Sequence, residues 1–176
     1  MLGRHVALIR GINVGKAKRI SMAELRAAIE ALGYTDVKTL LNSGNVVFTS
    51  DVAPAKAAAS IEKILTHEIG VPARVTVVTD EEMATAIAEN PLLDVADNPS
   101  RSFVAVLTNP ADLSKLKPLM QETWDPEALA LGKGVAYLWC PDGSIDSPLS
   151  KAVARALGDG VTTRNWATML KIQAAV

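Results

Sequence analysis

Two glycine-containing segments in the first third of the chain carry side chains that can bind an anion. Residues 10–20 (RGINVGKAKRI) hold four basic side chains, and residues 42–45 (NSGN) hold amide and hydroxyl groups. Guanidinium and ammonium groups attract phosphate or carboxylate, while amides and hydroxyls orient a bound ligand. The candidate ligand-binding residues of these segments are Arg10, Asn13, Lys16, Asn42, Ser43 and Asn45.

Each segment also has a purely structural interpretation. Gly11 and Gly15 are separated by three residues, whereas the phosphate-binding P-loop needs four, and Lys16 is followed by Ala17 rather than by Ser or Thr. A solvated loop is therefore the alternative for the first segment. Asn and Gly are ordinary turn residues because they tolerate positive φ, so residues 42–45 are equally typical of a plain hairpin turn.

A third polar run, Thr162–Trp166 (TTRNW), precedes an apolar stretch near the C-terminus. As structure, it is a helix cap followed by an anchoring tryptophan, and this is the interpretation we favour. As a binding segment, Arg164 and Asn165 offer groups for a carboxylate or phosphate, and they join the candidate site if this segment folds back.

The sequence offers little chemistry of other kinds. The histidines, His5 and His67, have no second His or Cys at ligand spacing, so no metal site and no cofactor are expected. Cys140 ends an apolar run, which favours a packed thiol over a nucleophile. Ser21 and Ser43 have no evident base in the sequence. Whether the protein is an enzyme stays open.

The composition is that of a globular protein with a local concentration of basic charge. Of 176 residues, 49% are hydrophobic and 21% charged, which excludes a chain that is disordered throughout. One cysteine excludes an internal disulfide framework. There is neither a signal peptide nor an apolar run of membrane-spanning length, so we expect a cytoplasmic protein without a membrane partner. Residues 1–80 carry 10 basic and 7 acidic side chains, and residues 81–176 carry 8 and 12.

The positioning elements follow from the apolar pattern. In the first half the order is strand, helix, strand, strand, helix, strand, the split arrangement of a ferredoxin-like unit. Ser21 and Glu24 are spaced as a capping box at the start of the first helix, and Pro54 starts the second. The predicted elements are strands at 5–10, 37–41, 46–48 and 74–79, and helices at 21–32 and 54–69.

The second half repeats this order after a connecting helix, which the capping-box pair Thr79 and Glu82 opens, and an extended linker. We expect a helix after Asn109, kinked at Pro118, and a final helix capped by Thr163. The predicted elements are strands at 102–108, 128–131, 135–140 and 161–162, and helices at 79–88, 110–122, 148–157 and 164–173.

The sequence therefore predicts an α+β fold: a tandem duplication of a ferredoxin-like unit with antiparallel sheets and a C-terminal helix. We divide it into a first subdomain at 1–80, a connecting helix and linker at 81–101, and a second subdomain at 102–176. In a split β-α-β unit the first strand ends at the edge where strands two and three are joined. The basic loop should therefore lie beside the turn at 42–45, together with the N-terminus of the first helix, a favourable place for an anion.

Several motifs resemble, in the same order, an uncharacterised and mostly bacterial family, domain of unknown function 1697. The matching segments are Val6–Gly15 (VALIRGINVG), Ile20–Met22 (ISM), Leu40–Phe48 (LLNSGNVVF), Asn90–Leu92 (NPL) and Thr162–Trp166 (TTRNW) with Thr168. The resemblance implies a duplicated ferredoxin-like α+β fold and no established activity, substrate or cofactor. The family often has a second glycine, then Lys and Asn, where this chain has Lys16-Ala17-Lys18, so positive charge is the better clue to this loop.

The favoured functional hypothesis is a binding protein for a small anionic or nucleotide-like ligand. A nucleic-acid-binding protein that uses the basic first half is the first alternative, and it predicts an affinity that falls steeply with salt. An enzyme acting on a phosphorylated substrate is the second alternative. The sequence leaves the oligomeric state open.

Overall fold

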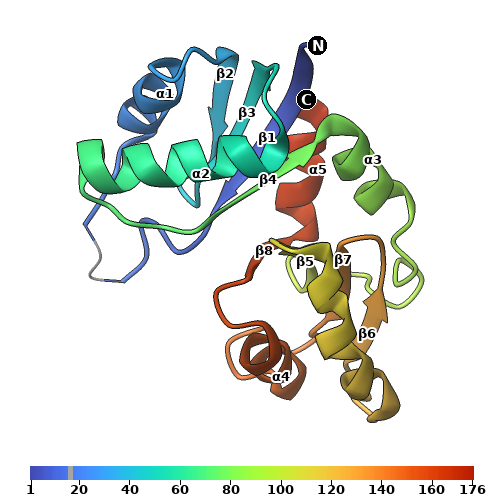
Figure 1. The fold of residues 1–176 in the computed structure, drawn as a ribbon. Coiled ribbons are helices and arrows are strands. Elements are labelled where there is room, and N and C mark those ends of the chain that lie inside the picture. The colour runs from blue at the N-terminus through green and yellow to red at the C-terminus, as the bar shows by residue number, and fades with distance from the viewer. Residues whose placement is uncertain (16–17) are drawn as a thin grey trace. The chain divides into compact units, whose positions relative to one another are not determined.

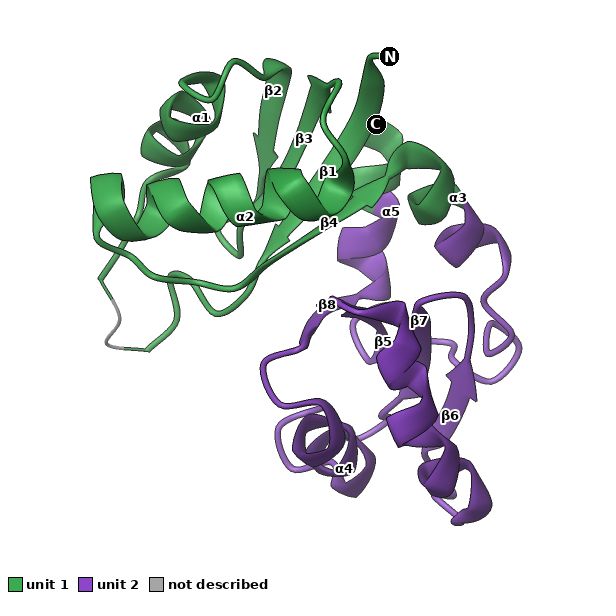
Figure 2. Ribbon diagram, viewed as in Figure 1, with its two compact units in different colours: residues 1–84, 171–176 green, residues 85–170 purple. Residues whose placement is uncertain are grey.

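The computed structural model describes residues 1–15 and 18–176. The chain forms two compact units, which Figure 2 distinguishes by colour. The first unit comprises residues 1–84 and 171–176, and the second unit comprises residues 85–170.

The first unit is a four-stranded antiparallel sheet with two principal helices (Figure 1). Its sheet order, β2-β3-β1-β4, is that of a ferredoxin-like fold, which confirms the predicted split β-α-β arrangement. The elements are β1 (Gly3–Ile9), α1 (Met22–Glu30), β2 (Thr35–Leu40), β3 (Asn45–Ser50), α2 (Pro54–Ile64), the π-helical turn η1 (Leu65–Ile69) and β4 (Val75–Thr79).

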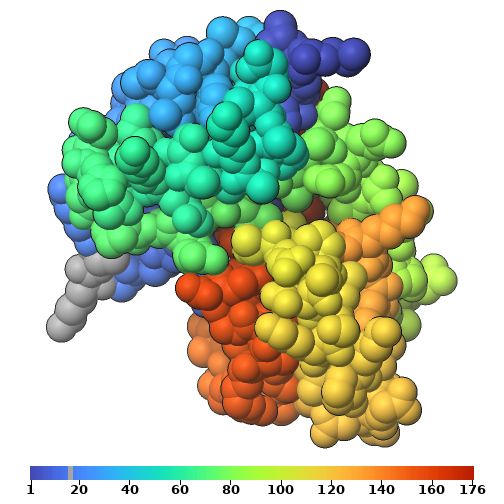
Figure 3. Space-filling view, in the orientation of Figure 1, coloured from blue at the N-terminus to red at the C-terminus, as the bar shows by residue number. Residues whose placement is uncertain are grey.

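Apolar side chains from α1 and α2 cover one face of this sheet. Leu25 of α1 and Ile61 of α2 are fully buried in one cluster with Phe48 of β3 and alternate residues of β1. The space-filling view shows the residues of α2 in front of the sheet (Figure 3). Burying these side chains stabilises the sheet by about 1.5–3 kcal/mol for each large apolar residue.

The second unit repeats the topology of the first, with sheet order β6-β7-β5-β8. Leu116, Leu149 and Val153 from its helices pack on Leu107 of β5 and Leu138 of β7. Two units with one connectivity confirm the predicted α+β duplication. The elements are β5 (Ser102–Leu107), the 3-10 helix η2 (Pro110–Gln121), β6 (Ala128–Leu131), β7 (Val135–Trp139), α4 (Pro148–Leu157) and β8 (Val161–Asn165).

Two further helices connect or extend the units. Helix α3 (Asp80–Ala88) opens on the predicted capping box: the Glu82 N–H donates to Thr79 Oγ1 at 3.1 Å, and the Thr79 N–H donates to Glu82 Oε2 at 2.9 Å. Helix α5 (Trp166–Ala175) is the last element in the chain order. Among the described residues, no helix is long and apolar enough to span a membrane.

Three predicted helices differ from the structure. The helix predicted at 54–69 is divided into α2 and the π-helical turn η1. Residues 110–121 form a 3-10 helix rather than an α-helix, since Pro118 has no N–H for the bond that an α-helix needs at its centre. The final helix begins at Trp166 rather than at 164, because residues up to Asn165 pair with β5 and extend β8. The side chain that caps α5 is Asn165, whose Oδ1 accepts from the Thr168 N–H at 2.8 Å; the prediction that Thr163 does so was wrong.

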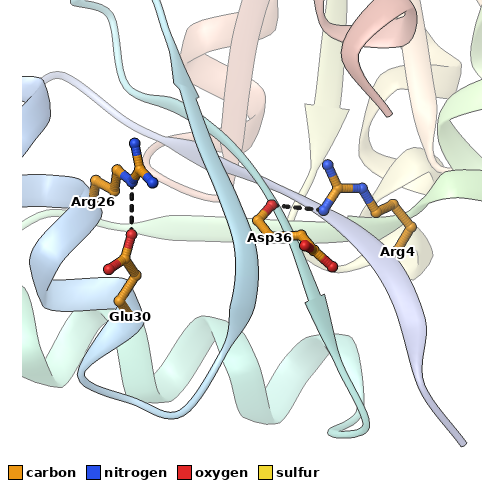
Figure 4. A network of polar contacts seen from close by, with 4 residues as sticks. All are labelled: Arg4, Arg26, Glu30 and Asp36. Atoms are coloured by element: carbon orange, nitrogen blue, oxygen red, sulfur yellow. Dashed lines mark hydrogen bonds and ion pairs between the residues drawn. The ribbon is translucent and has the colours of Figure 1, made fainter.

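Arg4 of β1 bonds to β2, the strand at one side of the first sheet (Figure 4). Arg4 Nη1 donates to the Asp36 carbonyl at 2.7 Å, next to an irregularity in the β2–β3 register, and to Thr49 Oγ1 at 3.3 Å. Asp36 has φ of 49°, a left-handed conformation that this bond helps to retain. Figure 4 also shows the separate Arg26–Glu30 ion pair of α1, 2.6 Å long and exposed.

Candidate functional site

The two glycine-containing segments meet at one edge of the first sheet. The Ile9 N–H donates to the Gly44 carbonyl at 2.9 Å, and Asn13 Nδ2 donates to the Asn42 carbonyl, also at 2.9 Å. The start of β4 lies at the same edge, because β4 pairs antiparallel with β1. We call this surface the basic rim; it comprises the described residues of 10–20 together with 41–44 and 70–74.

Two of the predicted binding residues hold the rim together. Asn13 Nδ2 also donates to the Ile20 carbonyl at 3.0 Å, and its Oδ1 accepts from the Ile20 N–H at 2.8 Å. Asn45 is fully buried, and its amide donates to the Leu40 carbonyl at 2.8 Å and to Ser43 Oγ at 2.9 Å. The bond from Asn13 to Asn42 joins the loop after β1 to the turn at 41–44, and the bonds of Asn45 fix the conformation of that turn.

The other predicted residues are distributed over several places. Arg10, Asn42 and Ser43 are exposed on the basic rim. Lys16 lies outside the described residues. Two further basic residues hold the rim itself: Lys18 Nζ donates to the Ile69 carbonyl at 2.7 Å, and Arg19 Nη1 donates to the Asn13 carbonyl.

Arg164 and Asn165 belong to β8 of the second unit. Arg164 Nη1 donates to the Thr163 carbonyl at 3.1 Å, and burial lowers the pKa of Arg164 to about 10. Asn165 serves as the cap of α5. Most of the polar run thus belongs to strand β8, and the cap of α5 lies two residues later than predicted.

A cavity of about 430 Å³ opens on the basic rim beside Arg10. The Arg10 N–H donates to the Arg74 carbonyl at 2.9 Å, so the residue that follows β1 and the residue that precedes β4 are neighbours. The cavity is lined by Arg10, Gly11, Glu62, Thr66, Pro72, Ala73 and Arg74. Its volume is within the range of small-molecule sites, which is about 300–1,000 Å³.

The lining residues of α2 and η1 were not predicted. Glu62 Oε1 accepts from the Val75 N–H at 2.8 Å and lies 3.9 Å from Arg74 Nε. The Thr66 hydroxyl donates to the Glu62 carbonyl at 2.9 Å. A sequence signal did exist for Arg74, because the ferredoxin-like order places the start of the fourth strand beside the end of the first.

The second unit supplies an internal comparison for this edge. There, the Leu107 N–H donates to the Gly134 carbonyl and the Thr108 N–H donates to the Gly160 carbonyl, both at 3.0 Å. These bonds correspond to the bonds from Ile9 and Arg10 in the first unit. Thr108 therefore occupies the position of Arg10, and Gly160 that of Arg74.

The charge of the two edges differs sharply. In the first unit, segments 10–20, 41–44 and 70–74 contain five basic residues and no acidic one. The corresponding segments of the second unit, 108–109, 132–134 and 158–160, contain one basic and one acidic residue. The same topology therefore forms in the second unit without this concentration of positive charge.

Other reactive groups of the described residues are held in structural contacts. No three His, Cys, Asp or Glu side chains gather as a metal site in residues 1–15 and 18–176. Cys140 is buried, and burial raises the pKa of its thiol to about 11. A thiol that stays protonated at neutral pH is a poor nucleophile.

Comparisons with known proteins agree with the fold. The model of a family described as "Protein of unknown function (DUF1697)" matches residues 2–137. Among solved structures, the chain is similar to a conserved bacterial protein, SP0830, from Streptococcus pneumoniae, with 22% sequence identity, a TM-score of 0.77 and 99% of each chain covered. The comparison with curated proteins gave no match. At this identity the similarity shows the fold alone.

Proposed function

The chain belongs to the family of proteins of unknown function DUF1697, and from the chemistry of its basic rim we propose that it binds a small anionic or nucleotide-like ligand. The ligand's phosphate or carboxylate lies in the cavity beside Arg10 and Arg74. Guanidinium groups suit this task because their planar donors match the geometry of both anions.

The observation that carries the proposal is the contrast between the two units. Arg10 and Arg74 line a cavity, whereas the equivalent positions of the second unit hold Thr108 and Gly160. Two copies of one fold thus differ where the ligand is expected. Positive charge at this place attracts an anion and increases the rate of association.

The rest of the basic rim supports this role indirectly. The hydrogen bonds of Lys18, Arg19 and Asn13 join the loop after β1 to the neighbouring turns. A loop held in this way loses less conformational entropy when a ligand binds. Asn42 and Ser43 lie exposed on the adjacent turn, where they would orient the ligand.

Calorimetric titration with inorganic phosphate and AMP tests the proposal. We expect Arg10→Ala and Arg74→Ala each to weaken binding about tenfold or more, as the loss of one charge-assisted contact predicts. Arg26→Ala is the matched control, since Arg26 is an exposed arginine of the same unit that pairs with Glu30 on α1. Absence of binding by the wild-type protein, or an equal loss in the control, would contradict the proposal.

The nucleic-acid alternative makes a different prediction in the same assay. A nucleic-acid-binding protein would bind a single-stranded oligonucleotide far more tightly than AMP. The logarithm of its association constant would fall linearly with the logarithm of the salt concentration, with a slope set by several phosphate contacts. We expect instead that an oligonucleotide of ten nucleotides binds no more tightly than AMP at equal salt concentration.

A further inference from the structure

Glu62 is the one acidic side chain among the described residues that line the cavity. It extends from the last turn of α2, with 30% of its side chain exposed. Oε1 accepts from the Val75 N–H at 2.8 Å. In the part of the chain that the structure describes, Oε2 has no hydrogen-bond partner. Glu62 therefore combines a structural bond through one oxygen with a second oxygen available to a ligand.

The structural bond does not explain the negative charge. A neutral amide oxygen accepts from the Val75 N–H as well as a carboxylate oxygen does. Arg74 Nε is 3.9 Å from Oε1, and half of the Arg74 side chain is exposed, so water weakens this ion pair. A carboxylate in a site for a simple anion would reduce affinity by repulsion.

The charges of the cavity instead match a ligand with groups of both signs. Arg10 follows β1, Arg74 precedes the neighbouring strand β4, and Glu62 of α2 lines the same cavity. The Thr66 hydroxyl donates to the Glu62 carbonyl, so its oxygen is left to accept a further hydrogen bond. Cation-binding groups thus come from α2 and η1, and anion-binding groups come from the residues next to β1 and β4.

We infer that the cavity takes a small zwitterionic ligand, such as an amino acid or an aminoalkyl phosphate. Its phosphate or carboxylate lies at Arg10 and Arg74, and its ammonium group donates to Glu62 Oε2. The inference rests on the proposed anion binding and adds a substrate class to it. The cavity volume of about 430 Å³ is near the lower end for small-molecule sites, which suits a ligand of this size.

The test compares two ligands of nearly equal shape, phosphoethanolamine and propyl phosphate, which differ by an ammonium group in place of a methyl group. Both are titrated calorimetrically into the wild-type protein, Glu62→Gln and Glu30→Gln. Glu62→Gln keeps an oxygen for the Val75 N–H and removes the charge. Glu30→Gln is the control, because Glu30 is an exposed glutamate of α1 that pairs with Arg26.

We expect the wild-type protein and Glu30→Gln to prefer phosphoethanolamine about tenfold. Glu62→Gln should bind the two ligands equally and should bind propyl phosphate more tightly than the wild-type protein does. The second effect distinguishes a ligand contact from a structural role, because mere loosening of the site weakens both ligands.

Equal affinity of the wild-type protein for the two ligands would overturn the inference that the ligand is zwitterionic and would leave the proposed anion binding intact. Binding of neither ligand, nor of inorganic phosphate, would overturn both. If Glu62→Gln fails to fold, the wild-type protein alone tests the inference. A preference for phosphoethanolamine supports it, and a preference for propyl phosphate contradicts it.

Discussion

Gly44 packs directly against Ile12, so the turn between β2 and β3 is in van der Waals contact with the loop that follows β1. A Cβ atom on Gly44 would lie 2.7 Å from Ile12 Cδ1, closer than Cβ atoms approach other atoms in proteins, and 3.0 Å from Ile9 Cβ, which is tighter than most such contacts. Gly44 also has φ of 88°, which disfavours any other residue. The convergence of the two segments thus depends on a glycine.

Gly44→Ala should destabilise the protein more than Gly33→Ala does. Gly33 has nearly the same φ, 89°, but a Cβ atom added to it would meet no heavy atom within 4 Å. Gly33→Ala should therefore cost only the left-handed conformation, about 1–2 kcal/mol. Gly44→Ala adds overcrowding of about 1–3 kcal/mol. Urea denaturation of both variants measures the difference, and equal losses would show that the turn yields without strain.

The position of this turn was predictable, but its detailed conformation was not. The order of strands and helices was sufficient to place residues 42–45 beside the loop after β1, because connectivity determines which strand ends share an edge. The positive φ angles occur at Leu41 and Gly44 rather than at Asn42. Asn42 instead contributes its backbone carbonyl to Asn13, a long-range contact that local turn preferences do not contain.

For the cavity, too, the topology was predictable from the sequence and the local conformation was not. Arg74 was recognisable as the first residue of a strand, and its proximity to Arg10 follows from the pairing of β4 with β1. The position of Glu62 depends on where α2 gives way to the π-helical turn η1. The apolar period continued through that turn, so the sequence predicted one uninterrupted helix to residue 69.

Asn13 should contribute to stability through both its side chain and its backbone. It makes three side-chain hydrogen bonds to Ile20 and Asn42, and it has φ of 57°. Asn13→Gly should lose about 2–3 kcal/mol, since a hydrogen bond contributes about 1 kcal/mol net. Asn13→Ala should lose about 1 kcal/mol more, because alanine disfavours this φ. Urea denaturation tests the order, and greater stability of the alanine variant would exclude the conformational contribution.

Ser147 should matter more than Ser21, although both cap helices. Ser21 is exposed and its Oγ accepts from the Glu24 N–H at 3.0 Å. Ser147 is buried; its Oγ accepts from the Ser150 N–H at 2.9 Å and donates to Glu127 Oε2. Ser21→Ala should cost about 1 kcal/mol. Ser147→Ala should cost about 2–3 kcal/mol, because it also removes the donor to Glu127 Oε2, while Oε1 keeps its bond from the Leu149 N–H. Thermal unfolding of the two variants compares them; similar losses would show that Glu127 finds another donor.

The buried thiol of Cys140 should make the protein less stable at alkaline pH. Burial, with a smaller contribution from Glu127, raises its pKa from 9.0 to about 11, opposed by the hydrogen bond from Ser147. Between these values the unfolded chain has released the proton and the folded chain retains it. The unfolded state therefore binds fewer protons, and the free energy of unfolding falls as the pH rises. By pH 10 this loss amounts to about 1 kcal/mol.

Cys140→Ala isolates this effect, because it removes the thiol and leaves the other titrating groups in place. Tyr137, whose pKa burial raises to about 12, contributes equally to both proteins. The wild-type protein should lose about 1 kcal/mol more than Cys140→Ala between pH 8 and pH 10, as measured by urea denaturation at each pH. A thiol reagent at pH 8 should react with Cys140 in urea and not in the native protein. Equal pH dependence of the two proteins would mean that the thiol ionises in the folded state as readily as in the unfolded chain.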